Sequence, residues 1–238
     1  MDFSINYTVE QIDEIIQHFK NWSNENNRPY YDDEYTVEAL KTYATRGGLE
    51  TYQDLRLVLP YILKASSILE IGAGYGRVID YLLNLKFKKQ IYAIERSPMF
   101  CKLLRKKYAR STINIIEDDI QTTSSLKPVD IILWMWSGIS DFSQQEQSLV
   151  IKKIAALINP QGHLIIETFH HTTNPINAIV STNQSYVIPS GKRIAYGYIP
   201  SPQEIENYAM IARFTAVKYL EYQTTTGRPR NMYILSKE

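Results

Sequence analysis

The residues with the clearest chemical meaning lie at 68–77, in the run Ile-Leu-Glu-Ile-Gly-Ala-Gly-Tyr-Gly-Arg. Its first four residues have the apolar character of a short buried strand, and apolar side chains recur at helical spacing after Arg77. Glycine lets a backbone turn tightly and approach a ligand closely. A strand that passes through three alternating glycines into a helix predicts a cradle for a nucleotide-type cofactor.

Two familiar nucleotide motifs do not match this loop. The dinucleotide fingerprint G-x-G-x-x-G requires a third glycine where this chain has Arg77. The phosphate-binding loop requires Lys-Ser or Lys-Thr after its last glycine, and neither follows Gly76. The pattern present is E-x-G-x-G-x-G, in which Glu70 stands two residues before Gly72.

This pattern resembles the first motif of class I S-adenosylmethionine-dependent methyltransferases. The resemblance implies that Gly72, Ala73, Gly74 and Gly76 contact S-adenosyl-L-methionine. It also implies that Glu70 holds the ammonium group at the methionine end of that cofactor, directly or through water. A glycine-rich turn that binds no ligand is the alternative explanation of the loop alone.

Acids at two later strand ends strengthen the resemblance. Residues 90–95 read as a strand ending in Glu95, about twenty residues after the glycines, where a carboxylate can accept both ribose hydroxyls. Residues 113–120 read as a third strand, and the resemblance implies that Asp119-Ile120 binds the adenine. The register can slip by one residue to Asp118. Each acid by itself could equally be a solvated strand end.

Further cofactor contacts and the acceptor site are expected at the ends of the same strands. Trp134 and Ser137 follow a fourth strand at 129–136, and Trp136 is a candidate for contact with cofactor or acceptor, although tryptophans there also pack the core. The Asn/Asp-Pro-Pro-aromatic tetrapeptide of DNA and many protein amide methyltransferases is absent, which counts against those substrates. Arg96 and Met99, beside the predicted ribose acid, complete the predicted cofactor contacts.

The predicted catalytic residues are His170, Trp136 and Tyr31. An imidazole titrates near neutral pH, so His170 can serve as a general base, although His170-His171 can also be a polar loop pair. The 18 tyrosines of the chain suit a pocket for a small polar or cationic acceptor, and they also simply fill space.

Arg46 carries a second, shorter resemblance. Thr45-Arg46, followed after a short gap by Tyr52, is similar to the segment before the first strand in glycine and sarcosine N-methyltransferase-like enzymes. That resemblance implies that Arg46 meets the carboxylate of the cofactor, a good partner for a guanidinium. The alternative is a cation favoured by the dipole at a helix C-terminus.

The elements that must position these residues predict an α/β fold. We expect a Rossmann-like class I methyltransferase sheet with helices on both faces and an antiparallel C-terminal hairpin at 214–236. Residues 1–50 are expected to form an N-terminal helical cap, beginning with a capping box at 8–11. Residues 51–238 are expected to form the methyltransferase domain, with a lid or hairpin insertion at about 170–200. Within it, Asn159-Pro-Gln-Gly162 is predicted to be a turn before a fifth strand at 163–169.

Composition limits the binding partners, metal sites and cellular location that we expect. The chain has 238 residues and a net charge of +1, so no global basic field argues for nucleic acid. Its single cysteine excludes an internal disulfide and a cysteine-built zinc site, and no metal site is expected. Without a signal pattern or a bilayer-spanning apolar run, no membrane association and a cytoplasmic location are expected.

Together these features predict an enzyme that transfers a methyl group from S-adenosylmethionine to a nitrogen or oxygen of a small molecule. Methylation of a protein side chain is one alternative. A non-catalytic S-adenosylmethionine-binding module is another, because the motifs predict cofactor binding better than they predict the reaction.

Overall fold

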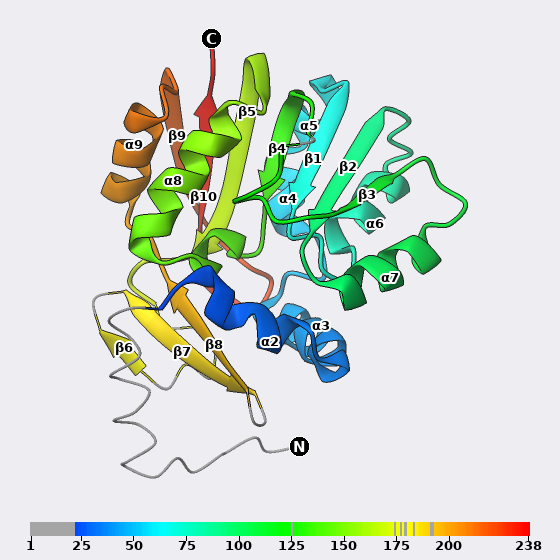
Figure 1. Cartoon of the computed structure of the whole chain (residues 1–238). Coiled ribbons are helices and arrows are strands. Elements are labelled where there is room, and N and C mark those ends of the chain that lie inside the picture. Colours follow the sequence, from blue (N-terminus) through cyan, green and yellow to red (C-terminus); the bar gives the residue numbers. More distant parts are fainter. Residues whose placement is uncertain are drawn as a thin grey trace.

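The strand-like runs of the sequence pair into one central sheet in the computed structural model (Figure 1). The structure describes residues 22–124, 126–173, 175–176, 178, 180–182, 184–190 and 193–238. The strands of this sheet are β1 (Ser67–Ile71), β2 (Gln90–Glu95), β3 (Asn114–Glu117), β4 (Val129–Trp134), β5 (Ile158–Phe169), β9 (Ala216–Gln223) and β10 (Pro229–Ser236). The predicted first helix at 8–19 lies outside the described residues.

The strand order is β3-β2-β1-β4-β5-β10-β9. Pairing is parallel from β3 through β5, and β10 is antiparallel to both β5 and β9. The predicted Rossmann-like sheet and its C-terminal hairpin are therefore confirmed. The order reverses between β1 and β4, and open α/β sheets bind ligands beyond the carboxyl ends of strands at such a point.

Helices cover both faces of the sheet (Figure 1). The helices are α3 (Glu34–Gly47), α4 (Gln53–Leu57), α5 (Leu59–Lys64), α6 (Arg77–Asn84), α7 (Pro98–Lys107), α8 (Gln144–Ala155) and α9 (Pro202–Ile211). On one face, Val150 of α8 and Ile205 of α9 join a core with Leu69 and its neighbours. On the other, Leu55 of α4 and Val78 of α6 join a core with Ile68. The two sides follow from the alternation of side chains along each strand.

One local prediction needed correction. The predicted turn Asn159-Pro-Gln-Gly162 lies inside β5, which begins at Ile158 rather than at His163. Gln161 adopts a positive φ of 62° there, and the register against β4 shifts, so the turn signal produced an irregularity within a continuing strand. Pro60 stands in the first turn of α5, after a break at Val58, so a new helix begins there.

A second layer stands beyond the carboxyl ends of the parallel strands (Figure 1). It contains the short η1 (Asn24–Asn27) and α2 (Arg28–Tyr31) and a small sheet of β6 (Val180–Thr182), β7 (Ser185–Ser190) and β8 (Arg193–Tyr198). The strands β7 and β8 form a hairpin within the region of about 170–200, where a lid or hairpin insertion was expected, and Pro189 pairs with Ile194 inside it. The boundary of the predicted cap at residue 50 stays a prediction.

Within the ranges given above, no helix is long and apolar enough to cross a bilayer.

Candidate active site

The glycine loop joins β1 to α6 in a conformation that needs glycine. Gly72, Gly74 and Gly76 have φ values of 67°, 52° and 89°, a region that side chains rarely tolerate. A Cβ atom on Gly72 would meet nothing within 4 Å, whereas one on Gly76 would overlap the Tyr108 ring. Gly72 therefore borders open space, and Gly76 is required by the packing of Tyr108, whose hydroxyl donates to the Gly76 carbonyl at 2.8 Å.

Glu70 is a buried acid without a donor. Its side chain lies at the end of β1 with the residue only 4% exposed, and Oε2 has no hydrogen-bond partner among the described residues. Burial raises the pKa of this carboxyl to about 8, although the nearby Arg77 lowers it. Buried polar atoms in proteins are normally paired. An unpaired carboxyl oxygen beside open space fits the ammonium group of a bound cofactor.

Arg77, whose position excluded the dinucleotide fingerprint, is part of the support for this loop. Its guanidinium donates to Asp54 Oδ1 at 3.1 Å and Oδ2 at 2.5 Å, and to the Leu49 carbonyl at 2.9 Å. Arg77 and Asp54 are both buried. A bidentate pair of this kind fixes both geometry and charge, so it ties the chain before β1 to the first turn of α6.

Glu95 ends β2 next to the glycine loop. Its Oε2 accepts a hydrogen bond from the Gly74 amide at 2.8 Å, and its Oε1 accepts one from the Ser97 amide at 2.9 Å. Burial raises the pKa of Glu95, and these backbone donors oppose that shift. Each carboxylate oxygen has further acceptor capacity, so this held carboxylate can also accept the two hydroxyls of a ribose.

The third acidic position follows β3. Asp119 Oδ1 accepts from the Gln121 amide at 2.8 Å, and its Oδ2 lies 3.8 Å from Arg96 Nη1. Asp118 Oδ1 accepts from the Asp119 amide at 2.8 Å. Both acids line the cavity described next, so the alternative registers of the sequence prediction remain open.

One cavity of about 300 Å³ is lined by these acids and also by Tyr31, Asp141, Tyr186 and Arg230; the part lined by the latter four is here called the second chamber. Its volume falls at the lower end of the range of small-molecule sites. Twelve of the residues predicted from sequence line it, namely Tyr31, Glu70, Gly72, Ala73, Gly74, Glu95, Arg96, Asp119, Ile120, Trp134, Trp136 and Ser137. The structure therefore brings them together, and their individual roles stay predictions.

The other four predicted residues are not among the described residues lining the cavity. The Arg46 side chain is exposed at the end of α3, and Gly76 lies under Tyr108. Met99 is half-buried in the first turn of α7. His170 Nδ1 lies 2.7 Å from Thr172 Oγ1, and its Nε2 lies 3.6 Å from Glu221 Oε1 on β9. The functions predicted for these four remain untested.

The second chamber contains an acid that the sequence analysis did not select. Asp141 closes η2 (Gly138–Asp141), which follows β4. Its Oδ2 accepts the Tyr31 hydroxyl at 2.8 Å. Burial raises the pKa of Asp141 to about 6, while the Tyr31 bond and the Arg96 charge lower it. Its position after a central strand was the available signal, but that segment contains no motif marking an acid.

A buried ionic network forms another wall of this chamber. Arg230 of β10 donates from Nε to Glu167 Oε1 at 2.6 Å and from Nη2 to Ser137 Oγ at 2.8 Å. Ser137 Oγ also accepts from the Phe169 amide at 2.9 Å. With two donors already directed at its oxygen, the Ser137 hydroxyl keeps its own proton to donate. Sequence reasoning missed Arg230 and Glu167, which are 63 residues apart and meet only through the pairing of β5 with β10.

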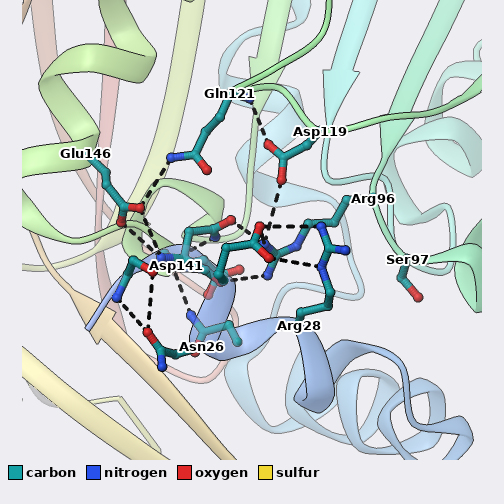
Figure 2. A network of polar contacts seen from close by, with 12 residues as sticks. Asn26, Arg28, Arg96, Ser97, Asp119, Gln121, Asp141 and Glu146 are labelled. Atoms are coloured by element: carbon teal, nitrogen blue, oxygen red, sulfur yellow. Dashed lines mark hydrogen bonds and ion pairs between the residues drawn. The ribbon is translucent and has the colours of Figure 1, made fainter. Parts of the chain in front are cut away.

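The layer formed by η1 and α2, here called the cover segment, is fastened across the site. Figure 2 shows Arg96 reaching between Asp119 and this segment. Arg96 bonds the Asn24 side chain and donates from Nη2 to the Asn24 carbonyl at 3.0 Å. The Asn24 amide donates to Glu146 Oε2 at 3.0 Å, and Asn24 Nδ2 donates to the Asp141 carbonyl at 2.9 Å. The cover segment thus contacts residues beside both Asp119 and the second chamber.

Residues 68–162 match a family model described as a methyltransferase domain. This match covers the glycine loop and all three acidic strand ends. These residues therefore form a methyltransferase domain, and the chain has the fold of class I S-adenosylmethionine-dependent methyltransferases. A search of curated protein sequences finds no significant match to the methyltransferase. No group of His, Cys, Asp and Glu placed to hold a metal is found in the part of the chain that the structure describes.

Solved structures share the fold of the methyltransferase. DesVI of Streptomyces venezuelae matches with a TM-score of 0.64 and 18% identity, covering 87% of this chain and 99% of that one. S-adenosylmethionine-bound CalS10 of Micromonospora echinaspora, an amino pentose methyltransferase, matches with a TM-score of 0.57 and 12% identity over the full length of both chains. The 1,6-didemethyltoxoflavin-N1-methyltransferase of Burkholderia thailandensis matches with a TM-score of 0.55 and 14% identity, covering 100% of this chain and 93% of that one.

Proposed function

We propose that this methyltransferase transfers the methyl group of S-adenosylmethionine to a nitrogen or oxygen of a small molecule. The observation that carries the proposal is the continuity of the cavity from the unpaired Glu70 carboxyl to a second chamber lined by Tyr31, Asp141 and Arg230. The cover segment and the β7–β8 hairpin close over that chamber, with Tyr30 and Tyr186 at its wall. A cavity of about 300 Å³ favours a small acceptor over a protein side chain.

The residues present fit the cofactor without rearrangement of the loop. Glu70 would hold the ammonium group, Glu95 the ribose hydroxyls and Asp119-Ile120 the adenine, while Gly72 and its neighbours leave room beside them. When bound, S-adenosylmethionine supplies a methyl group on a sulfonium, which is already a strong electrophile. The task of the protein is then to place the acceptor in line and to exclude water.

The neighbours in fold support a small acceptor. One is an amino pentose methyltransferase, and another is a toxoflavin-precursor methyltransferase with its small acceptor and S-adenosylhomocysteine bound. Arg46 and His170 stay candidates for the cofactor carboxylate and for a general base, although neither side chain lines the described cavity.

The test has two stages. Calorimetry should show binding of S-adenosylhomocysteine and no binding of NAD; the reverse result would refute the cofactor assignment. Purified protein should then form S-adenosylhomocysteine from S-adenosylmethionine when given a deproteinised small-molecule extract, and not when given the protein fraction of the same extract. Turnover with the protein fraction alone would support the protein-substrate alternative. Cofactor binding without turnover with either fraction would support a non-catalytic binding module.

A further inference from the structure

We propose that the acceptor is an amine, and that Asp141 binds its ammonium group and accepts the proton that the amine gives up. This inference rests on the proposed function, because it assigns the substrate class of the same cavity. It is argued from the contacts of Asp141, from the charges around it and from the rings that share its chamber.

Contacts within the chain position the carboxylate of Asp141 but leave part of its hydrogen-bonding capacity unused. Among the described residues, Tyr31 donates to Oδ2 at 2.8 Å, and Oδ1 is left for a ligand. The backbone of Asp141 is held from the cover segment, since its carbonyl accepts from Asn24 Nδ2 at 2.9 Å and from Asn27 Nδ2 at 3.2 Å. An anionic oxygen is thus fixed at the cavity wall with acceptor capacity to spare.

Among the described residues, three of the four arginines that line the cavity are paired within the chain, and the fourth, Arg228, has an exposed side chain. Arg230 is paired with Glu167, Arg77 with Asp54, and Arg96 with Asn24 and, at 3.8 Å, with Asp119. The groups that face Asp141 are Arg96 and Glu95 from β2 and the loop after it, Tyr30 and Tyr31 from α2, and Tyr186 from β7. Arg96 is the one cation in this described set, and Glu95 opposes it, so the chamber favours a positively charged ligand.

Aromatic rings surround the same space. Tyr30 and Tyr31 meet edge to face with ring centroids 5.0 Å apart, and Phe169 meets Tyr186 edge to face at 5.8 Å. All four residues line the cavity. Ring faces attract cations, most strongly where water is excluded. An ammonium group gains charge attraction from both the carboxylate and these rings, whereas an alcohol, which carries no charge, gains only a hydrogen bond to the carboxylate.

The same residue can remove the proton that blocks the reaction. An ammonium has no lone pair, so it must first give a proton to Asp141, and burial in an apolar chamber favours the neutral pair over two charges. The nitrogen lone pair then forms the new N–C bond to the methyl group. The S–C bond breaks with its electron pair left on sulfur, which neutralises the sulfonium and yields S-adenosylhomocysteine. The proton on Asp141 leaves to solvent when the product is released.

The test uses full-length protein saturated with S-adenosylhomocysteine and two matched probe pairs, benzylamine with benzyl alcohol and cyclohexylamine with cyclohexanol. At pH 7.5 the amines should bind about ten- to a hundredfold more tightly than the alcohols, the range expected of a charged hydrogen bond. The preference should vanish in Asp141→Asn and should fall as the pH drops through about 6, where Asp141 gains its proton. Glu206→Gln, at an exposed acid of α9, should leave it unchanged.

The outcomes distinguish failure of the amine assignment from failure of the proposed function. Equal binding of amine and alcohol in both pairs overturns the amine assignment, and so does an amine preference that survives in Asp141→Asn. Retained S-adenosylhomocysteine binding by Asp141→Asn shows that the variant is folded. Failure of the parent protein to bind S-adenosylhomocysteine would overturn the proposed function itself, which separates the two failures.

Discussion

Binding of S-adenosylhomocysteine should release a proton from Glu70, and the substitution Glu70→Gln should abolish this release. Burial raises the pKa of this carboxyl to about 8, so at pH 7 it is about 90% protonated in the free protein. The ammonium group of the ligand stays charged in this range and favours the ionised carboxylate. Binding at pH 7 should therefore release about 0.9 proton from the parent protein and almost none from Glu70→Gln.

The affinity of the parent protein should depend on pH for the same reason. Between pH 6 and pH 8 the ionised fraction of Glu70 rises from about 0.01 to about 0.5, so the affinity should rise about 50-fold. In Glu70→Gln this dependence should disappear, leaving a weak affinity close to that of the parent at low pH. Glu117→Gln is a matched control, because Glu117 is opposite Glu95 on the neighbouring strand but its side chain is exposed and paired with Arg105.

The free energy of unfolding of the parent protein should fall as the pH rises, whereas its affinity for S-adenosylhomocysteine should increase. The folded pKa of Glu70 lies above its unfolded value of 4.5, so the stability that its protonation contributes is lost as the pH rises toward 8. That loss amounts to about 1.4 kcal/mol per pH unit in this window. The free energy of unfolding of Glu70→Gln should therefore fall less steeply with pH than that of the parent.

Calorimetry in buffers of different ionisation enthalpy measures the released proton, and urea unfolding at several pH values measures the slope. Pairing of Glu70 with the ammonium would be refuted by a pH-independent affinity with no proton release in the parent. It would also be refuted if Glu117→Gln lost the pH dependence and Glu70→Gln kept it.

Three further perturbations test other parts of the site. Glu95→Ala should weaken S-adenosylhomocysteine binding by about 2–4 kcal/mol, the worth of two charge-assisted hydrogen bonds; calorimetry showing an unchanged affinity would place the ribose acid elsewhere. Gly76→Ala should destabilise the fold in urea by more than Gly227→Ala, because both have positive φ but only Gly76 packs under a ring; equal losses would contradict the packing role. Arg96→Ala should speed protease cleavage of the cover segment, which Arg96 holds through Asn24, and S-adenosylhomocysteine should slow cleavage of the parent; cleavage indifferent to both would detach this segment from the site.

The cofactor end of the cavity could be predicted because its residues carry their signals locally. The glycine loop needs backbone angles that few other residues tolerate, and it lies between an apolar strand and an amphipathic helix that are contiguous in sequence. Glu95 and Asp119 follow strands that pair in parallel, and the carboxyl ends of parallel strands meet at one edge of a sheet. The spacing of the strands in the sequence was therefore enough to predict that these acids lie near the glycine loop, and no long-range contact had to be known.

The acceptor end could not be predicted in the same way. Asp141 stands in a short 3-10 turn with no motif, and its importance comes from Tyr31, which is 110 residues away in sequence. Arg46 and His170 have suitable chemistry, but the described cavity is lined by other residues. Local sequence reports which groups an element carries, whereas the direction of a loop side chain depends on what packs against it.

The sequence by itself determined the parallel strands, the glycine loop and the acids at the strand ends, because short apolar runs and glycine backbone angles carry those signals locally. Tertiary structure alone decided that Asp141 shares a chamber with Tyr31. It also brought Glu167 to Arg230 across the β5–β10 pairing. Such contacts depend on the packing of segments distant in sequence, and no single segment carries their pattern.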